Sequence, residues 1–196
     1  MLKSVKSLVL ITMITLFSGP VDAQLRLPAL SGIGSDVKKV IEDYPNRFIN
    51  LMGEVRMENT QSTDYQCNFN VNGAEEAIVT RYSANKEICS WQALMLTTEN
   101  FEKARQKFKA LYNQLNNLAV DLGDNKNFHL KGKYDTPEEA KKFSIVLFSI
   151  EPGIDAVKKL KVELSMQYEA PMEWKVKVLV YDKERADDER GNTVDE

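Results

Sequence analysis

An apolar stripe with helical spacing runs through residues 98–123 and constrains the fold more than any other feature. Its members recur at alternating gaps of three and four residues, which keeps them on one side of an α-helix. They are Phe101, Ala104, Phe108, Leu111, Leu115, Leu118 and Leu122. Thr98 is placed to cap the first turn, and Gly123 is placed to stop the helix in a left-handed conformation. The spacing predicts a helix over residues 98–122 that lies on an apolar surface.

A second amphipathic segment covers residues 35–52 and begins with Ser35 and Asp36, which suit a helix start. Pro45 lies inside this segment. Because proline removes a backbone donor and clashes with the preceding turn, it interrupts a helix. The sequence therefore predicts either a kinked helix or two short ones, the second with Pro45 in its first turn.

Most of the remaining segments alternate apolar and polar residues, which is typical of half-buried antiparallel strands. The clearest are 160–168 and 174–181, which predict a long hairpin. Asn72-Gly73 follows another alternating run and favours a tight hairpin turn, whose two central residues need positive φ. Residues 143–150 are apolar on both sides, which predicts a strand near the middle of the sheet with both faces covered.

These elements predict an α+β fold of two layers, an antiparallel sheet of about six or seven strands with the helices 98–122 and 35–52 packed on it. We expect an extended lead-in over 24–34 and a single domain over 35–182. Residues 183–196 carry a run of charges and one valine, so we expect a disordered tail there.

Residues 1–23 have the pattern of an export signal. Lys3 and Lys6 precede an uncharged apolar run over 8–17, and small residues at 21–23 suit a cleavage before Gln24. The alternative is a membrane anchor left in place, but a run of this length is short for a stable span. We expect a periplasmic or extracellular protein with no membrane span after signal removal.

The charge balance is that of an ordinary soluble protein. The chain has 26 Lys and Arg against 29 Asp and Glu, a net charge of −3. This gives no electrostatic reason to expect nucleic acid or an anionic membrane as a partner.

Cys67 and Cys89 are the only cysteines. In an exported protein two cysteines are usually paired, and a bridge closing this loop would contribute about 3 kcal/mol. Both lie on predicted strands. If a third strand separates them, their Cβ atoms are about 10 Å apart, too far to bond. The sequence leaves two options, a disulfide or two separate buried thiols.

The sequence contains no recognisable catalytic or metal-ligand motif. His129 is the only histidine, lies on the same predicted polar face as Lys131 and Lys133, and is not accompanied by a G-x-S-x-G turn. Asp121 and Asp124 lack the glycine and the later glutamate of a calcium loop. We therefore expect no catalytic residues, no metal and no cofactor.

Leu179 and Tyr181 fall on the outer side of their strand. Together with Leu94 and Leu96 they form a candidate exposed apolar patch for a partner, unless the sheet curls or a helix covers that face. We expect an exported, non-enzymatic protein that binds a protein or a small apolar ligand, with a groove between the 98–122 helix and the sheet as the place to look. The alternatives are a small secreted hydrolase with an unrecognised carboxylate or Ser/Lys site, and a structural subunit of an envelope assembly.

Overall fold

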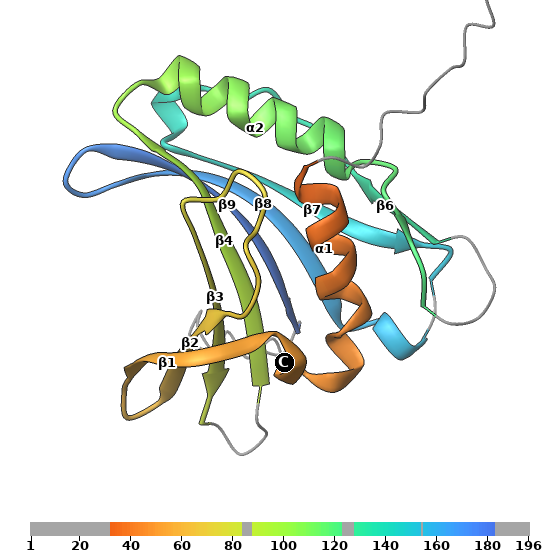
Figure 1. Ribbon diagram of the computed structural model, residues 1–196. Coiled ribbons are helices and arrows are strands. Elements are labelled where there is room, and N and C mark those ends of the chain that lie inside the picture. Colours follow the sequence, from red (N-terminus) through yellow and green to blue (C-terminus); the bar gives the residue numbers. More distant parts are fainter. Residues whose placement is uncertain (1–31, 84–87, 123–127, 154, 183–196) are drawn as a thin grey trace, which may run out of the picture.

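The computed structural model describes residues 32–83, 88–122, 128–153 and 155–182 (Figure 1). The predicted signal peptide, most of the lead-in and the charged tail lie outside the described residues. Ile33 and Gly34, which the sequence assigned to the lead-in, belong to the first helix.

The fold is α+β, as predicted, with one antiparallel sheet that is larger than expected. It has nine strands in the order β1-β2-β3-β4-β9-β8-β7-β6-β5. The last strand, β9, joins the two halves, because it pairs with β4 on one side and β8 on the other. The strands are β1 (Met52–Glu58), β2 (Ser62–Cys67), β3 (Glu76–Tyr82), β4 (Ile88–Thr98), β5 (Ala119–Val120), β6 (Phe128–Gly132), β7 (Phe143–Glu151), β8 (Leu160–Glu169) and β9 (Glu173–Asp182).

Two helices, α1 (Ile33–Glu42) and α2 (Phe101–Leu115), lie on one face of this sheet, here called the inner face (Figure 1). The stripe of α2 is buried against β4, β8 and β9, with Ala104, Phe108 and Leu115 fully inaccessible. Burial of such apolar side chains contributes roughly 1.5–3 kcal/mol each for the larger ones. The opposite, outer face has no helix on it among the described residues.

Helix α2 is shorter at both ends than the predicted 98–122. It begins at Phe101 because Asn100, rather than Thr98, is the cap: the Asn100 side chain accepts a hydrogen bond from the Lys103 N–H at 2.9 Å. It ends at Leu115 because Asn117 takes a left-handed φ of 70° and its N–H donates to the Leu130 carbonyl. Gly123, the predicted stop, lies outside the described residues.

The N-terminal helix is interrupted, as the proline predicts. After α1 come two 3₁₀ turns, η1 (Tyr44–Asn46) and η2 (Ile49–Leu51), and Pro45 lies in the first turn of η1. Asp36 is not a cap but lies inside α1. It is buried, and its carboxylate accepts hydrogen bonds from the Asn72 N–H at 2.8 Å and the Asn72 Nδ2 at 2.9 Å.

The turn at Asn72-Gly73, next to these bonds, differs from the predicted tight hairpin turn. A turn does form, because the Ala74 N–H donates to the Val71 carbonyl at 3.2 Å. Only Gly73 has positive φ, however, whereas the predicted turn type needs it at both positions. Pairing between β2 and β3 accordingly stops at Gln66 and Ile78.

The possible disulfide between Cys67 and Cys89 does not form. Both residues are buried, β3 lies between their strands, and Cys89 is level with Thr63 rather than with Cys67.

The prediction that residues 143–150 are covered on both faces is wrong. Strand β7 is not covered on both faces. Its inner-face side chains Val146 and Phe148 are buried, but an outer-face row is exposed. This row, called the β7 apolar row, consists of Phe143 (59%), Ile145 (37%) and Leu147 (53%).

Candidate functional site

Strands β7 and β8 separate at one end, and this split is the most distinctive feature of the sheet. Their pairing runs from Phe143 to Phe148 on β7 and ends at the pair Phe148–Val162. Both strands continue beyond that pair, β7 to Glu151 and β8 back to Leu160. Each remains bonded on its far side, β7 to β6 and β8 to β9. The split is therefore an opening inside the sheet, not a frayed end.

Backbone groups of both strands face this opening. In an antiparallel pair, every second residue directs its N–H and C=O toward the neighbouring strand. The Tyr168 N–H donates to the Lys142 carbonyl at 2.8 Å, which makes the even-numbered residues of both strands the bonded ones. By this alternation, the N–H and C=O groups of Ile150 and Leu160 point into the split, two residues beyond the last pair on each strand.

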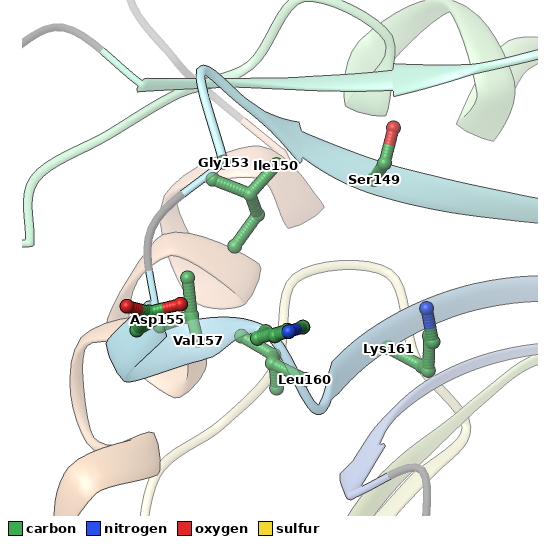
Figure 2. A pocket seen from close by; sticks show the side chains of 8 residues that line it. Ser149, Ile150, Gly153, Asp155, Val157, Leu160 and Lys161 are labelled. Atoms are coloured by element: carbon green, nitrogen blue, oxygen red, sulfur yellow. The ribbon is translucent and has the colours of Figure 1, made fainter.

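The split encloses a cavity of about 320 Å³ (Figure 2). Its remaining border is the connection between the strands, which includes the 3₁₀ turn η4 (Asp155–Val157). In Figure 2, Ile150 extends from β7 toward Val157, and Lys161 extends from β8 toward β7. The lining residues are Ser149, Ile150, Gly153, Asp155, Val157, Lys158, Leu160 and Lys161.

The two sides of the cavity differ in polarity. Val157 and Leu160 are buried and belong to the hydrophobic core, with Ile150 packed against it. Ser149 and Lys161 are odd-numbered and lie on the outer face, where the Ser149 hydroxyl donates to the Lys131 carbonyl at 3.3 Å. A ligand here would meet an apolar wall on one side and hydrogen-bonding and charged groups on the other.

The outer face is held by polar contacts between β8 and β9 at two places. Near the cavity, the Tyr181 hydroxyl donates to Glu163 at 2.9 Å. At the opposite end of β8, Glu169 is 2.6 Å from Lys177 Nζ and 3.2 Å from Lys175 Nζ. Partial burial acts to raise the pKa of Glu169, but the hydrogen bonds and charges of both lysines outweigh it and lower that pKa. A lowered pKa keeps the carboxylate charged, which suits an ion pair rather than a proton donor.

The four residues of the predicted apolar patch do not form one surface. Leu94 and Leu179 lie on the outer face and are partly exposed. Tyr181 lies on the same face but is buried. Leu96 lies on the inner face and packs against the core, because an irregularity in the β4–β9 pairing between Leu94 and Leu96 reverses the alternation. The β7 apolar row, by contrast, consists of three exposed apolar side chains on the outer face.

The other predicted locations lie elsewhere in the fold. His129 is partly buried on β6, with Nδ1 3.3 Å from the Asn117 carbonyl. The space between α2 and the sheet is filled by the buried stripe, so the expected groove is not found along those residues. Within the described part of the chain, His, Cys, Asp and Glu side chains nowhere gather in threes as a metal site would require. None of the described helices has the length and apolar character needed to cross a bilayer.

Sequence reasoning placed both strands of the cavity but missed the cavity itself. The available signal was the connection over 152–159, which is too long for a tight hairpin and includes the apolar Val157. Comparison of the chain with protein-family models, with curated proteins and with solved structures found no match.

Proposed function

We propose that this chain is an exported, non-enzymatic binding protein that holds a small ligand in the split between β7 and β8. The split is the observation that supports the proposal. A sheet normally closes such a gap by continuing its ladder, whereas here two bonded strands leave backbone groups of Ile150 and Leu160 directed into a cavity. Export is inferred from the pattern of residues 1–23.

The size and lining of the cavity favour binding over catalysis. Ligand pockets run from about 300 to 1,000 Å³ and combine apolar walls with a few polar groups. At about 320 Å³, this cavity suits a small molecule or the end of a larger one. The titratable groups among its described lining residues are Asp155, Lys158 and Lys161.

A variant at the border of the cavity tests the proposal. Gly153 lines the cavity, and a Cβ there would meet no heavy atom within 4 Å beyond its chain neighbours. Gly153→Phe therefore adds an aromatic ring at the border of the cavity without displacing the core. Ala140→Phe, at an exposed position of the 3₁₀ turn η3 (Glu139–Lys141), adds the same ring elsewhere and is the control.

The full chain and both variants are screened against small carboxylic acids, amines and dipeptides by thermal shift, followed by calorimetry. Compounds that bind the wild-type chain and Ala140→Phe should bind Gly153→Phe at least tenfold more weakly. Equal affinity for Gly153→Phe would overturn the proposal. The recovered compound is analysed by mass spectrometry, because a hydrolase would convert it. Sedimentation of the same samples shows whether the chain behaves as an assembly subunit instead.

A further inference from the structure

Strand β7 has a free edge over its first residues. Its ladder with β6 covers only residues 148–151, whereas its ladder with β8 covers residues 143–148. After Gly132 the chain leaves β7 for the helix layer, where the Tyr134 ring packs against two aromatic rings of α2. The side of β7 that faces β6 therefore has no neighbouring strand over residues 143–147 among the described strands.

Phe143 and Ile145 direct their backbone groups toward this free edge. The even-numbered residues of β7 bond to β8, so the N–H and C=O groups of the odd-numbered residues point the other way. In the part of the chain that the structure describes, neither Phe143 nor Ile145 forms a backbone hydrogen bond on that side. Such unpaired groups are a template on which another strand can form a ladder.

The two outer edges of the sheet have features that hinder pairing, and the free edge of β7 lacks them. Edge strands commonly avoid further pairing by being short, bulged or charged. Strand β5 has two residues, and β1 has two irregularities in its ladder and three charged side chains. The β7–β8 ladder, by contrast, is regular over residues 143–148, and residues 143–147 carry no charge. The free edge of β7 is therefore the one best suited to pair with another strand.

This edge is complementary to itself. A second copy can run antiparallel to the first about a two-fold axis at Ser144, which places Phe143 of each copy opposite Ile145 of the other. The unpaired N–H and C=O groups of both residues then bond across the axis in both directions. The β7 apolar rows of the two copies become neighbours on one outer face, and no charge in this stretch faces a like charge.

We propose that two copies of this chain associate through the free edges of β7, so that one sheet continues across both copies. A two-fold contact uses the same surface on each copy, so it joins two chains and does not extend into an array. Because the paired stretch is short, the dimer is weak and forms as the protein concentration rises. The cavity residues Ser149 and Ile150 lie farther along β7, so this inference goes beyond the proposed function and does not rest on it.

Sedimentation equilibrium of the full chain over a range of concentrations tests the inference. The mass should rise from that of one chain to that of two. Ile145→Lys puts a charge into the apolar row at the free edge and should raise the dimer dissociation constant at least about tenfold. Val55→Lys puts the same charge at an exposed apolar position of the edge strand β1 and should leave the constant unchanged. A chain that stays monomeric, an Ile145→Lys constant equal to that of wild type, or equal constants for the two variants would overturn the inference.

Hydrogen exchange of the wild-type chain tests the backbone pairing without depending on whether a variant folds. The amides of Phe143 and Ile145 should exchange more slowly at high protein concentration than at low concentration, because they become bonded in the dimer. The amides of β1 should exchange at the same rate at both concentrations. Exchange over residues 143–147 that does not change with concentration would show that any association uses another surface, and the inference would fall.

Discussion

At the scale of single residues, Glu169 shows how the outer face of the sheet is held together. Its carboxylate is hydrogen-bonded to Lys177 and paired with Lys175, both on the neighbouring strand. The three side chains are about two-thirds buried or more. The pKa of Glu169 is lowered by these lysines despite the opposing effect of burial. The ion pairs therefore contribute to folding only while the carboxylate is charged.

This gives a pH-dependent prediction. A carboxyl group with a lower pKa in the folded chain than in the unfolded chain stabilises the folded state. This contribution is complete at pH values above the unfolded pKa, which is about 4.3 for Glu. It is lost as the pH falls through the pKa of the folded state. Glu169→Gln should cost about 0.5 kcal/mol of unfolding free energy at pH 7, the scale of partly exposed ion pairs. Urea unfolding from pH 7 to pH 3 should show the difference from wild type shrinking toward zero. Glu139→Gln, exposed on η3, is the charge-matched control, and a Glu169→Gln difference that persists at pH 3 would contradict the argument.

At the scale of elements, helix α2 shows that its stripe and its ends are set by different interactions. The stripe is continuous in sequence through Leu118, which is buried although it lies beyond the helix. The start depends on Asn100, which satisfies the Lys103 N–H, whereas Thr98 accepts only from the Asn100 N–H at 3.2 Å. A cap side chain that bonds within the first turn is the one that stabilises a helix.

Two alanine variants test which residue caps the helix. Asn100→Ala should lower the unfolding free energy by about 1 kcal/mol, the usual cost of losing a cap. Thr98→Ala should cost less than half of that, because Thr98 makes no bond to the helix itself. Urea denaturation followed by circular dichroism measures both. A larger cost for Thr98→Ala would mean that the helix begins where the stripe predicted.

The difference between the periodic stripe of α2 and the local contacts at its ends explains which features could be predicted from the sequence. Spacing identified α2, the long β8–β9 hairpin and the α+β class, because buried faces leave a periodic pattern. It did not locate the end at Leu115, because the left-handed Asn117 and its bond to Leu130 belong to the tertiary fold. It also could not locate the split between β7 and β8. Alternation identifies a strand, but where two strands stop pairing depends on the path of the connection between them.

At the scale of the whole molecule, the arrangement is two layers with one face of the sheet uncovered in the described residues. Both helices pack on the inner face, and β9, the last strand of the described residues, lies at the centre of the sheet between β4 and β8 (Figure 1). Residues 143–150 suggested cover on both faces because they are apolar throughout. Composition alone does not tell a strand between two layers from a strand whose outer face is apolar and exposed.

Two neighbouring lysine substitutions on β7 test the two-layer arrangement. Leu147 belongs to the exposed β7 apolar row and lies opposite Glu163 on β8. Leu147→Lys places a positive charge beside the Glu163 carboxylate. This variant should change the unfolding free energy by no more than about 0.5 kcal/mol. Val146 is buried on the inner face, and Val146→Lys should cost more than about 3 kcal/mol because it buries an unpaired charge. Urea unfolding measures both variants. The two positions are adjacent on β7 but lie on opposite faces, and Leu147 already has the Glu163 carboxylate opposite it. If Leu147→Lys were as damaging as Val146→Lys, a further layer would have to cover the outer face, and the cavity in the split would not be accessible from that side.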